Sequence, residues 1–156
     1  KAMGQVNCTW ARFNAAMEDA KKQQGKDAQR QLARERALPI RKELVSQVGQ
    51  VHRLLLETIT TTGGMGTVAN WQQHLLPSLL TQPGKELAGI LGEPLPADAE
   101  PSDSYDGPAR LIVPTVRTNL LAGEDLRLKV ILVGRASSPV LCWRPLDKGG
   151  FSPIPL

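Results

Sequence analysis

The feature that most constrains this fold is a change in the spacing of its apolar residues. Up to residue 92 they recur every three or four positions, the period of a helix with one buried face. From residue 109 they alternate with other residues at every second position, the period of a half-buried strand. Between these parts, residues 93–108 form an acidic stretch with four prolines. The sequence therefore predicts an α+β fold in three parts.

The first part, residues 1–92, is expected to form a three- to four-helix bundle. Gly25 marks the end of a first helix and Asp27 caps a second one. Pro39 predicts a kink or break near Leu38, because proline lacks an amide donor and clashes with the preceding turn. A short last helix follows Pro83. The two apolar stripes are Val6, Trp10, Phe13, Met17 and Ala20, and then Leu32, Ile40, Leu44, Val48, Val51, Leu55 and Ile59.

Residues 60–80 hold the most unusual composition of the chain. Three glycines follow a threonine run, which predicts a sharp irregular turn, with Thr67 or Asn70 capping the helix after it. Pro77 is expected to end or kink that helix. The glycines are Gly63, Gly64 and Gly66.

This corner is the best candidate site in the sequence. A flat aromatic ring beside amides suits a sugar, since apolar sugar faces lie on aromatic rings and amides pair with hydroxyls. The candidate sugar-binding residues are Asn70, Trp71, Gln73 and His74, together with Trp143 near the other end of the chain. The alternative is a plain helix–turn–helix corner with Trp71, Leu75 and Leu76 in the core. A phosphate-binding loop is excluded, because no lysine follows the glycines.

The other two parts are a connector and a β-strand tail. Residues 93–108 are expected to be an extended linker or a strap that lies on the surface. Residues 109–156 predict strands at 110–116, 126–133, 140–143 and 151–156, the start of an immunoglobulin-like sandwich. A complete sandwich needs about seven strands. The partial sheet therefore needs a cover: the helices, another chain, or the rest of a longer protein.

Charge and composition exclude several classes of function. The chain has a net charge of +4, but its basic residues are interleaved with acids and glutamines. This pattern argues against nucleic-acid binding. No apolar run is long enough to predict a membrane span. Cys8 and Cys142 lie far apart and are expected to be free buried thiols unless the fold brings them together. His52 has no second ligand one helical turn away, so no metal site is predicted. No cofactor is predicted either.

Most of residues 28–156 resembles a region of large bacterial glycoside-hydrolase-type proteins. The resemblance lies in TTTGGMGTVANWQQHLLPSLL, ELAGILGEPLPADA, GPARLIVPTVRTNLLAGEDLRLKVILV and LCWRPL. In that family, helices after a catalytic region lead through a glycine turn and a tryptophan helix into a β-sandwich module. The resemblance implies polysaccharide processing and an exported protein, with the catalytic barrel upstream of Lys1.

Three functions follow from these observations. The first is an accessory or fragment region of a carbohydrate-active protein that contacts a polysaccharide or oligosaccharide without a catalytic site of its own. The alternative is a non-enzymatic module for protein interaction or self-association, through its helices or its exposed β edge. The third is glycoside hydrolysis by this chain, which needs two carboxylates about 5–10 Å apart. The acids near the corner are Glu86, Glu93, Asp98 and Asp103.

Overall fold

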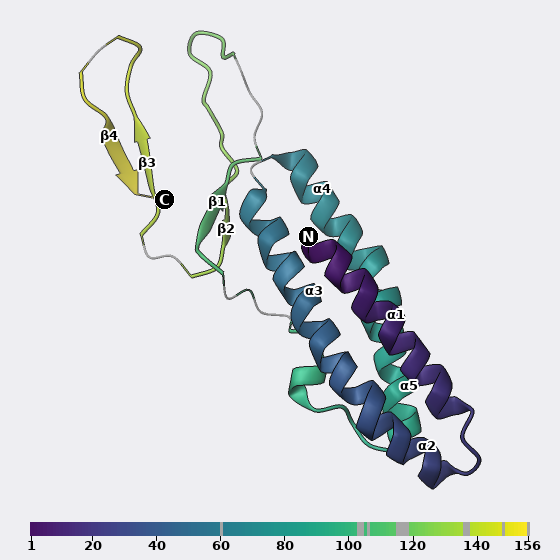
Figure 1. Cartoon of the computed structure of the whole chain (residues 1–156). Coiled ribbons are helices and arrows are strands. Elements are labelled where there is room, and N and C mark those ends of the chain that lie inside the picture. Colours follow the sequence, from purple (N-terminus) through teal and green to yellow (C-terminus); the bar gives the residue numbers. More distant parts are fainter. Residues whose placement is uncertain are drawn as a thin grey trace. The chain divides into compact units, whose positions relative to one another are not determined.

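The structure is a computed structural model of the whole chain (Figure 1). It describes residues 1–59, 61–102, 105, 107–114, 119–135, 138–147 and 149–155, without the side chain of Thr62. The chain divides into two compact units, Lys1–Tyr105 and Asp106–Leu156. We call them the helical unit and the β unit, and each is described by itself.

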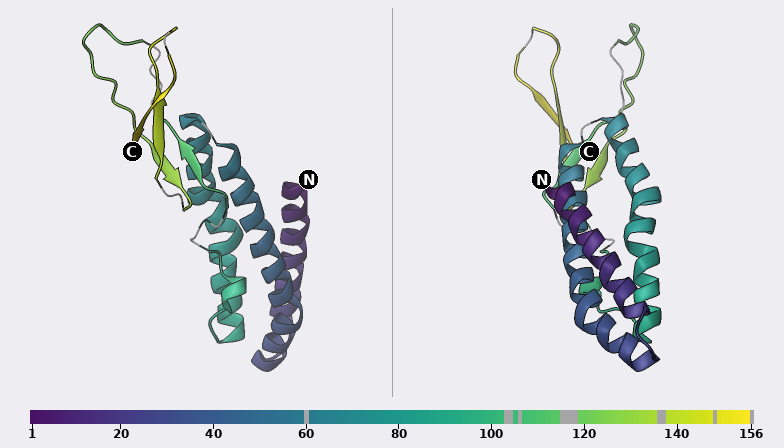
Figure 2. Two further views of the ribbon diagram at one scale, coloured as in Figure 1. Left: turned by 90° about the vertical axis from the view of Figure 1, so that its left-hand side faces the viewer. Right: turned by 45° about the vertical axis from the view of Figure 1, so that its right-hand side comes forward.

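The helical unit consists of three continuous helical segments, which run side by side in Figure 2. The first is α1 (Ala2–Lys21). The second joins α2 (Lys26–Leu32), a π-helical turn η1 (Ala33–Ala37) and α3 (Leu38–Thr58). The third joins α4 (Thr62–Asn70), two π-helical turns η2 (Trp71–Leu75) and η3 (Pro77–Thr81), and α5 (Gln82–Leu91).

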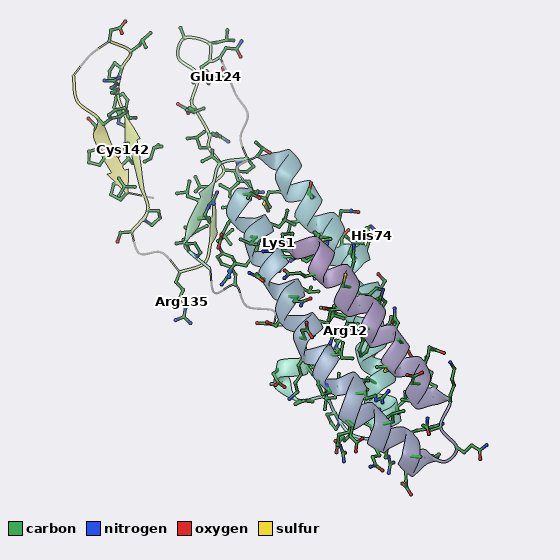
Figure 3. All side chains as sticks on the ribbon, in the orientation of Figure 1. Lys1, Arg12, His74, Glu124, Arg135 and Cys142 are labelled. Carbon is green, nitrogen blue, oxygen red and sulfur yellow. The ribbon has the colours of Figure 1, made fainter. Side chains whose placement is uncertain are left out.

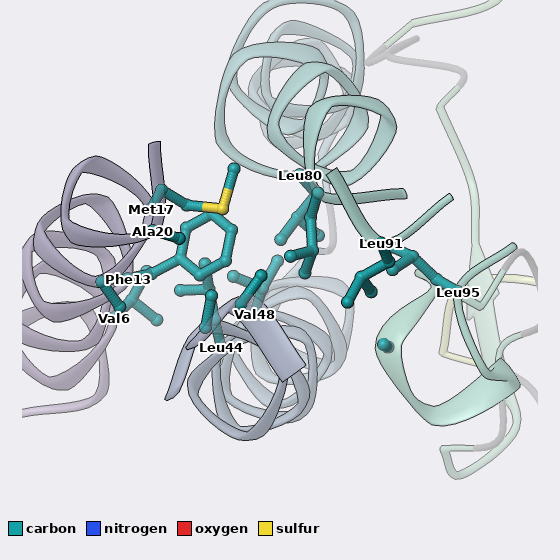
Figure 4. Close-up of a cluster of buried hydrophobic side chains, with 14 of the residues drawn as sticks. Val6, Phe13, Met17, Ala20, Leu44, Val48, Leu80, Leu91 and Leu95 are labelled. Atoms are coloured by element: carbon teal, nitrogen blue, oxygen red, sulfur yellow. The ribbon is translucent and has the colours of Figure 1, made fainter. Parts of the chain in front are cut away.

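One hydrophobic core lies between the three segments, and Figure 4 shows its centre. Both predicted stripes point into it, because residues three and four apart share a helix face. The buried members are Val6, Phe13, Ala16, Met17, Ala20, Ala33, Ala37, Leu44, Val48, Trp71, Leu80, Leu87, Leu91, Leu95 and Ala99. The core thus includes residues 95 and 99, which follow the last helix.

The prolines do not end the helices, so of the two outcomes predicted at Pro39 and Pro77, a break or a kink, the break is wrong. Each π-helical turn ends two residues before a proline: η1 before Pro39, η2 before Pro77 and η3 before Pro83. Proline cannot donate to the carbonyl four residues earlier and crowds it. The wider π turn is a known way to absorb an irregular step within a helix, so the segments continue past each proline.

The glycine-rich stretch is helical, which corrects the predicted irregular turn. The helix α4 begins at Thr62 and includes Gly63, Gly64 and Gly66. Its N-cap is Thr61, whose Oγ1 accepts a hydrogen bond from the Gly64 amide at 3.2 Å. This cap replaces the one expected at Thr67 or Asn70. Thr60, where the predicted stretch begins, lies outside the described residues.

The other predicted helix ends have mixed outcomes. Gly92 ends α5 in the left-handed conformation, with φ of 70°, as predicted for a C-terminal glycine. The second segment begins at Lys26 with Gly25 as its N-cap, so Asp27 lies in the first turn and is not the cap. The first helix begins at Ala2.

Residues 93–105 belong to the helical unit. A short 3-10 helix, η4 (Ala97–Ala99), contacts α3, and the side chains of Leu95 and Ala99 are buried in the core. The backbone carbonyl of Ala99 accepts a hydrogen bond from Arg41 Nε at 3.0 Å. We call residues 93–105 the strap.

The β unit contains two separate two-stranded antiparallel sheets. In the first, β1 (Arg110–Ile112) pairs with β2 (Ile131–Val133). In the second, β3 (Val140–Trp143) pairs with β4 (Ser152–Pro155). The strand predicted at 126–133 is shorter in the structure, where only Ile131–Val133 pair with β1. The prediction for residues 115 and 116 falls outside the described part. The α+β fold is confirmed.

Candidate functional site

The indole of Trp71 is buried at the junction of α4 and η2. Its exposed fraction is 6%, and it belongs to the hydrophobic core. The His52 ring of α3 lies against it, with 5.5 Å between ring centroids and 39° between ring planes. A sugar needs an exposed aromatic face to stack on. In this structure the Trp71 ring packs the helices together.

The three polar candidates on the same segment lie at the surface. Asn70, Gln73 and His74 are all exposed, and Figure 3 labels His74 on η2. Asn70 and Gln73 lie one and two positions from Trp71 and so fall away from the inward face that its ring occupies. His74, three positions after Trp71, is exposed as well. The structure therefore separates the polar candidates from the aromatic ring, and the predicted ring-plus-amide site does not assemble.

A neighbouring contact was missed by the sequence reasoning. Gln72 Nε2 lies 3.4 Å from His52 Nε2, so the amide and the imidazole meet between η2 and α3. Burial lowers the pKa of His52, because it disfavours the charged imidazolium. His52 and Gln72 are 20 positions apart, and no local spacing could have paired them.

The acids near the corner form ion pairs with exposed cations. Glu86 pairs with Lys21 at 2.8 Å, Glu93 with Arg34 at 2.7 Å, and Asp98 with Lys42 at 2.9 Å. Asp103 lies outside the described residues. A glycosidase needs two carboxylates that face one substrate. The three described acids instead tie different elements of the helical unit to one another.

Arg41 is the most unusual polar residue of the helical unit. Its side chain is fully buried, and Nε donates to the Ala99 carbonyl of the strap at 3.0 Å. Nη1 and Nη2 have no hydrogen-bond partner among the described residues. Burial lowers the pKa of Arg41, an effect that the charge of Glu100 partly offsets. A side chain on Gly84 would meet Nη2 at 2.8 Å, so glycine leaves room for the guanidinium.

Trp143, the candidate in the β unit, is at the end of β3 and has an exposed fraction of 49%. Its ring is therefore accessible to a partner or a ligand. Cys142, next to it, is a free and exposed thiol, and so is Cys8 on α1. The expectation that both thiols are buried is wrong. Each lies on a strand or helix face that meets solvent.

The described residues contain no group of three or more His, Cys, Asp or Glu side chains able to hold a metal ion. Within the same residues, no helix has the length and apolar character needed to cross a membrane. Comparisons with protein-family models, with curated proteins and with solved structures found no match to this chain.

Proposed function

We propose that this chain is a non-catalytic accessory module that associates with a protein surface through its β unit. The observation that supports this most strongly is the exposure of apolar side chains there. In the described part of that unit only Ile112 is buried. Exposed large apolar residues include Leu111, Leu121, Leu126, Leu132, Val140, Leu146, Phe151 and Ile154. Apolar surface of this kind marks interaction sites.

The helical unit has the opposite character and would act as the folded support. Its apolar stripes meet in one core, which the strap extends. We take this unit to be a helical bundle and the two sheets to be part of an immunoglobulin-like sandwich. In that arrangement the sheets gain a core only when a partner covers them. The resemblance to glycoside-hydrolase-type proteins gives a setting for such a module, beside a polysaccharide-acting domain.

The test compares two leucines of similar exposure in the full chain. Leu132 in β2 is 41% exposed and Leu54 in α3 is 43% exposed. We expect wild type and Leu54→Lys to associate as concentration rises in sedimentation velocity, and Leu132→Lys to associate at least tenfold more weakly. A chain that stays monomeric over the whole concentration range contradicts the proposal.

A second candidate function is glycan contact through Trp143, which the exposure of its ring favours. Affinity electrophoresis in gels that contain plant or algal polysaccharides tests it. Trp143→Ala should lose the retardation and Trp143→Phe should keep part of it. Equal mobility of wild type in gels with and without every polysaccharide removes this candidate.

A further inference from the structure

The two edges of the β3–β4 sheet differ in their backbone donors. In an antiparallel pair, successive residues alternately bond to the partner strand and point away from it. Pro153 stands opposite Cys142, and Pro155 opposite Val140. Because proline has no amide donor, the bonds of this ladder must run through the intervening pairs, Ile154 with Leu141 and Ser152 with Trp143.

It follows that the backbone groups of Val140 and Cys142 point outward from β3. The outer edge of β3 therefore presents the amide donors and the carbonyl acceptors of these two residues. Among the described residues, no strand other than β4 pairs with β3, and no further backbone hydrogen bond involves Val140 or Cys142. The outward positions of β4 are Pro153 and Pro155, which have no donor. Prolines at such positions block the addition of a strand. This sheet therefore has one open edge and one closed edge.

We propose that a second copy of this chain occupies the open edge, with β3 pairing antiparallel to β3 of that copy. This proposal rests on the proposed function, that the β unit associates, and it names the partner and the edge. An edge that presents donors and acceptors on alternate residues is complementary to itself under a twofold rotation. Residues 140–143 have no charge, so self-pairing brings no like charges opposite one another within the strand.

The direction of the backbone groups restricts the register of this pairing. Only registers that place Val140 or Cys142 opposite Val140 or Cys142 of the second copy bring outward groups together. The strand can extend past its ends, because Pro139 and Pro145 fall on the positions that face β4. Neither proline removes an outward donor.

The closed edge explains why this pairing would stop at two copies. A sheet with two open edges can add strands without limit, whereas a sheet with one open edge is saturated by one partner. The β unit, residues 106–156, holds seven Lys or Arg and four Asp or Glu, so each β unit has a net charge of +3. Two such units repel each other. Salt screens that repulsion, and the dimer should tighten as salt concentration rises.

The experiment is sedimentation velocity of the full chain, with Cys142→Pro and its control Cys142→Ser. The proline removes one outward donor and leaves the bonds to β4 in place, whereas the serine keeps the donor. We expect wild type and Cys142→Ser to form a dimer, and Cys142→Pro to dimerise at least tenfold more weakly. If Cys142→Pro dimerises like wild type, the edge is wrong while association by the β unit stands. If every variant, wild type included, is monomeric, the proposed function fails as well.

A second variant tests the assignment of the open and closed edges if Cys142→Pro fails to fold. Replacing Pro153 and Pro155 together by threonine restores donors on the outer edge of β4. We expect this variant to grow beyond the dimer into longer assemblies, since both edges are then open. A variant that stops at the dimer, as wild type does, would overturn the claim that β4 is the closed edge.

Discussion

At the scale of single residues, Arg41 is the largest completely buried side chain among the residues that the structure describes. Its Nε bond to the Ala99 carbonyl joins α3 to the strap. The two remaining nitrogens have no partner among the described residues, and a buried unpaired donor costs free energy. The residue thus fixes the position of the strap while it opposes the stability of the core.

Replacing Arg41 by methionine and by alanine separates these two effects. Arg41→Met keeps most of the volume and removes the buried charge, so we expect the free energy of unfolding to stay within about 1 kcal/mol of wild type or to rise. Arg41→Ala leaves a cavity and should lower it by about 2–4 kcal/mol. Urea unfolding measures both. A methionine variant as unstable as the alanine variant would mean that the guanidinium makes a net favourable contribution.

His52 makes stability depend on pH. Burial against Trp71 lowers the pKa of the folded state below the ordinary value of 6.5. Between those two pKa values the unfolded chain binds more protons than the folded chain. The stabilising effect of neutral His52 is therefore complete above pH 6.5 and is lost as pH falls below it.

This predicts a difference between wild type and His52→Gln in unfolding experiments from pH 7.5 to 5.5. The free energy of unfolding of wild type should fall more steeply over this range, because glutamine does not titrate. Parallel curves for the two proteins would show that His52 is not buried in solution.

At the scale of helices and strands, two alanine substitutions in α4 test whether the glycine-rich stretch is helical. Gly66 has open space around the position of a Cβ atom, so Gly66→Ala should raise the free energy of unfolding by about 1 kcal/mol, the usual difference in helix propensity. At Gly64 an added Cβ would lie 3.3 Å from two carbon atoms of Ile59, so Gly64→Ala should gain less or nothing. Thermal unfolding compares them. A loss of stability at Gly66 would restore the irregular turn predicted from the sequence.

The sequence predicted the elements that follow from periodicity. The stripe from Val6 to Ala20 locates α1, because its apolar residues recur at the helical period. The short apolar run at Val140–Trp143 locates β3. The continuation of the helices past Pro39 and Pro77 was not predictable, since it depends on π-helical turns, which have no recognised signal in the sequence. Proline alone argues for a kink or a break.

The candidate site shows the same limit. The composition around Trp71 suits a sugar as well as it suits a core, and only packing decides which way the ring points. The contact between His52 and Gln72 depends on how α3 and the third segment meet. No spacing along one segment can give such a contact. Exposure of Trp143 likewise depends on what covers the sheet.

At the scale of the whole molecule, the two units bury apolar surface to different extents. The helical unit places fifteen residues in one buried cluster. In the described part of the β unit one residue is buried, and two-stranded sheets of this size are marginal in water without packing. We therefore expect the helical unit to be stable alone and the β unit to depend on association.

Amide hydrogen exchange followed by NMR at increasing protein concentration tests this account most directly. The account predicts slow exchange at Phe13, Leu44 and Leu87 at every concentration, and protection at Val140 and Cys142 that appears only as the protein becomes concentrated. The inward amides of Leu141 and Ile154 should gain protection in parallel, since the sheet is stabilised as a whole. Protection of Val140 and Cys142 that is already complete in dilute protein and does not change with concentration would contradict it.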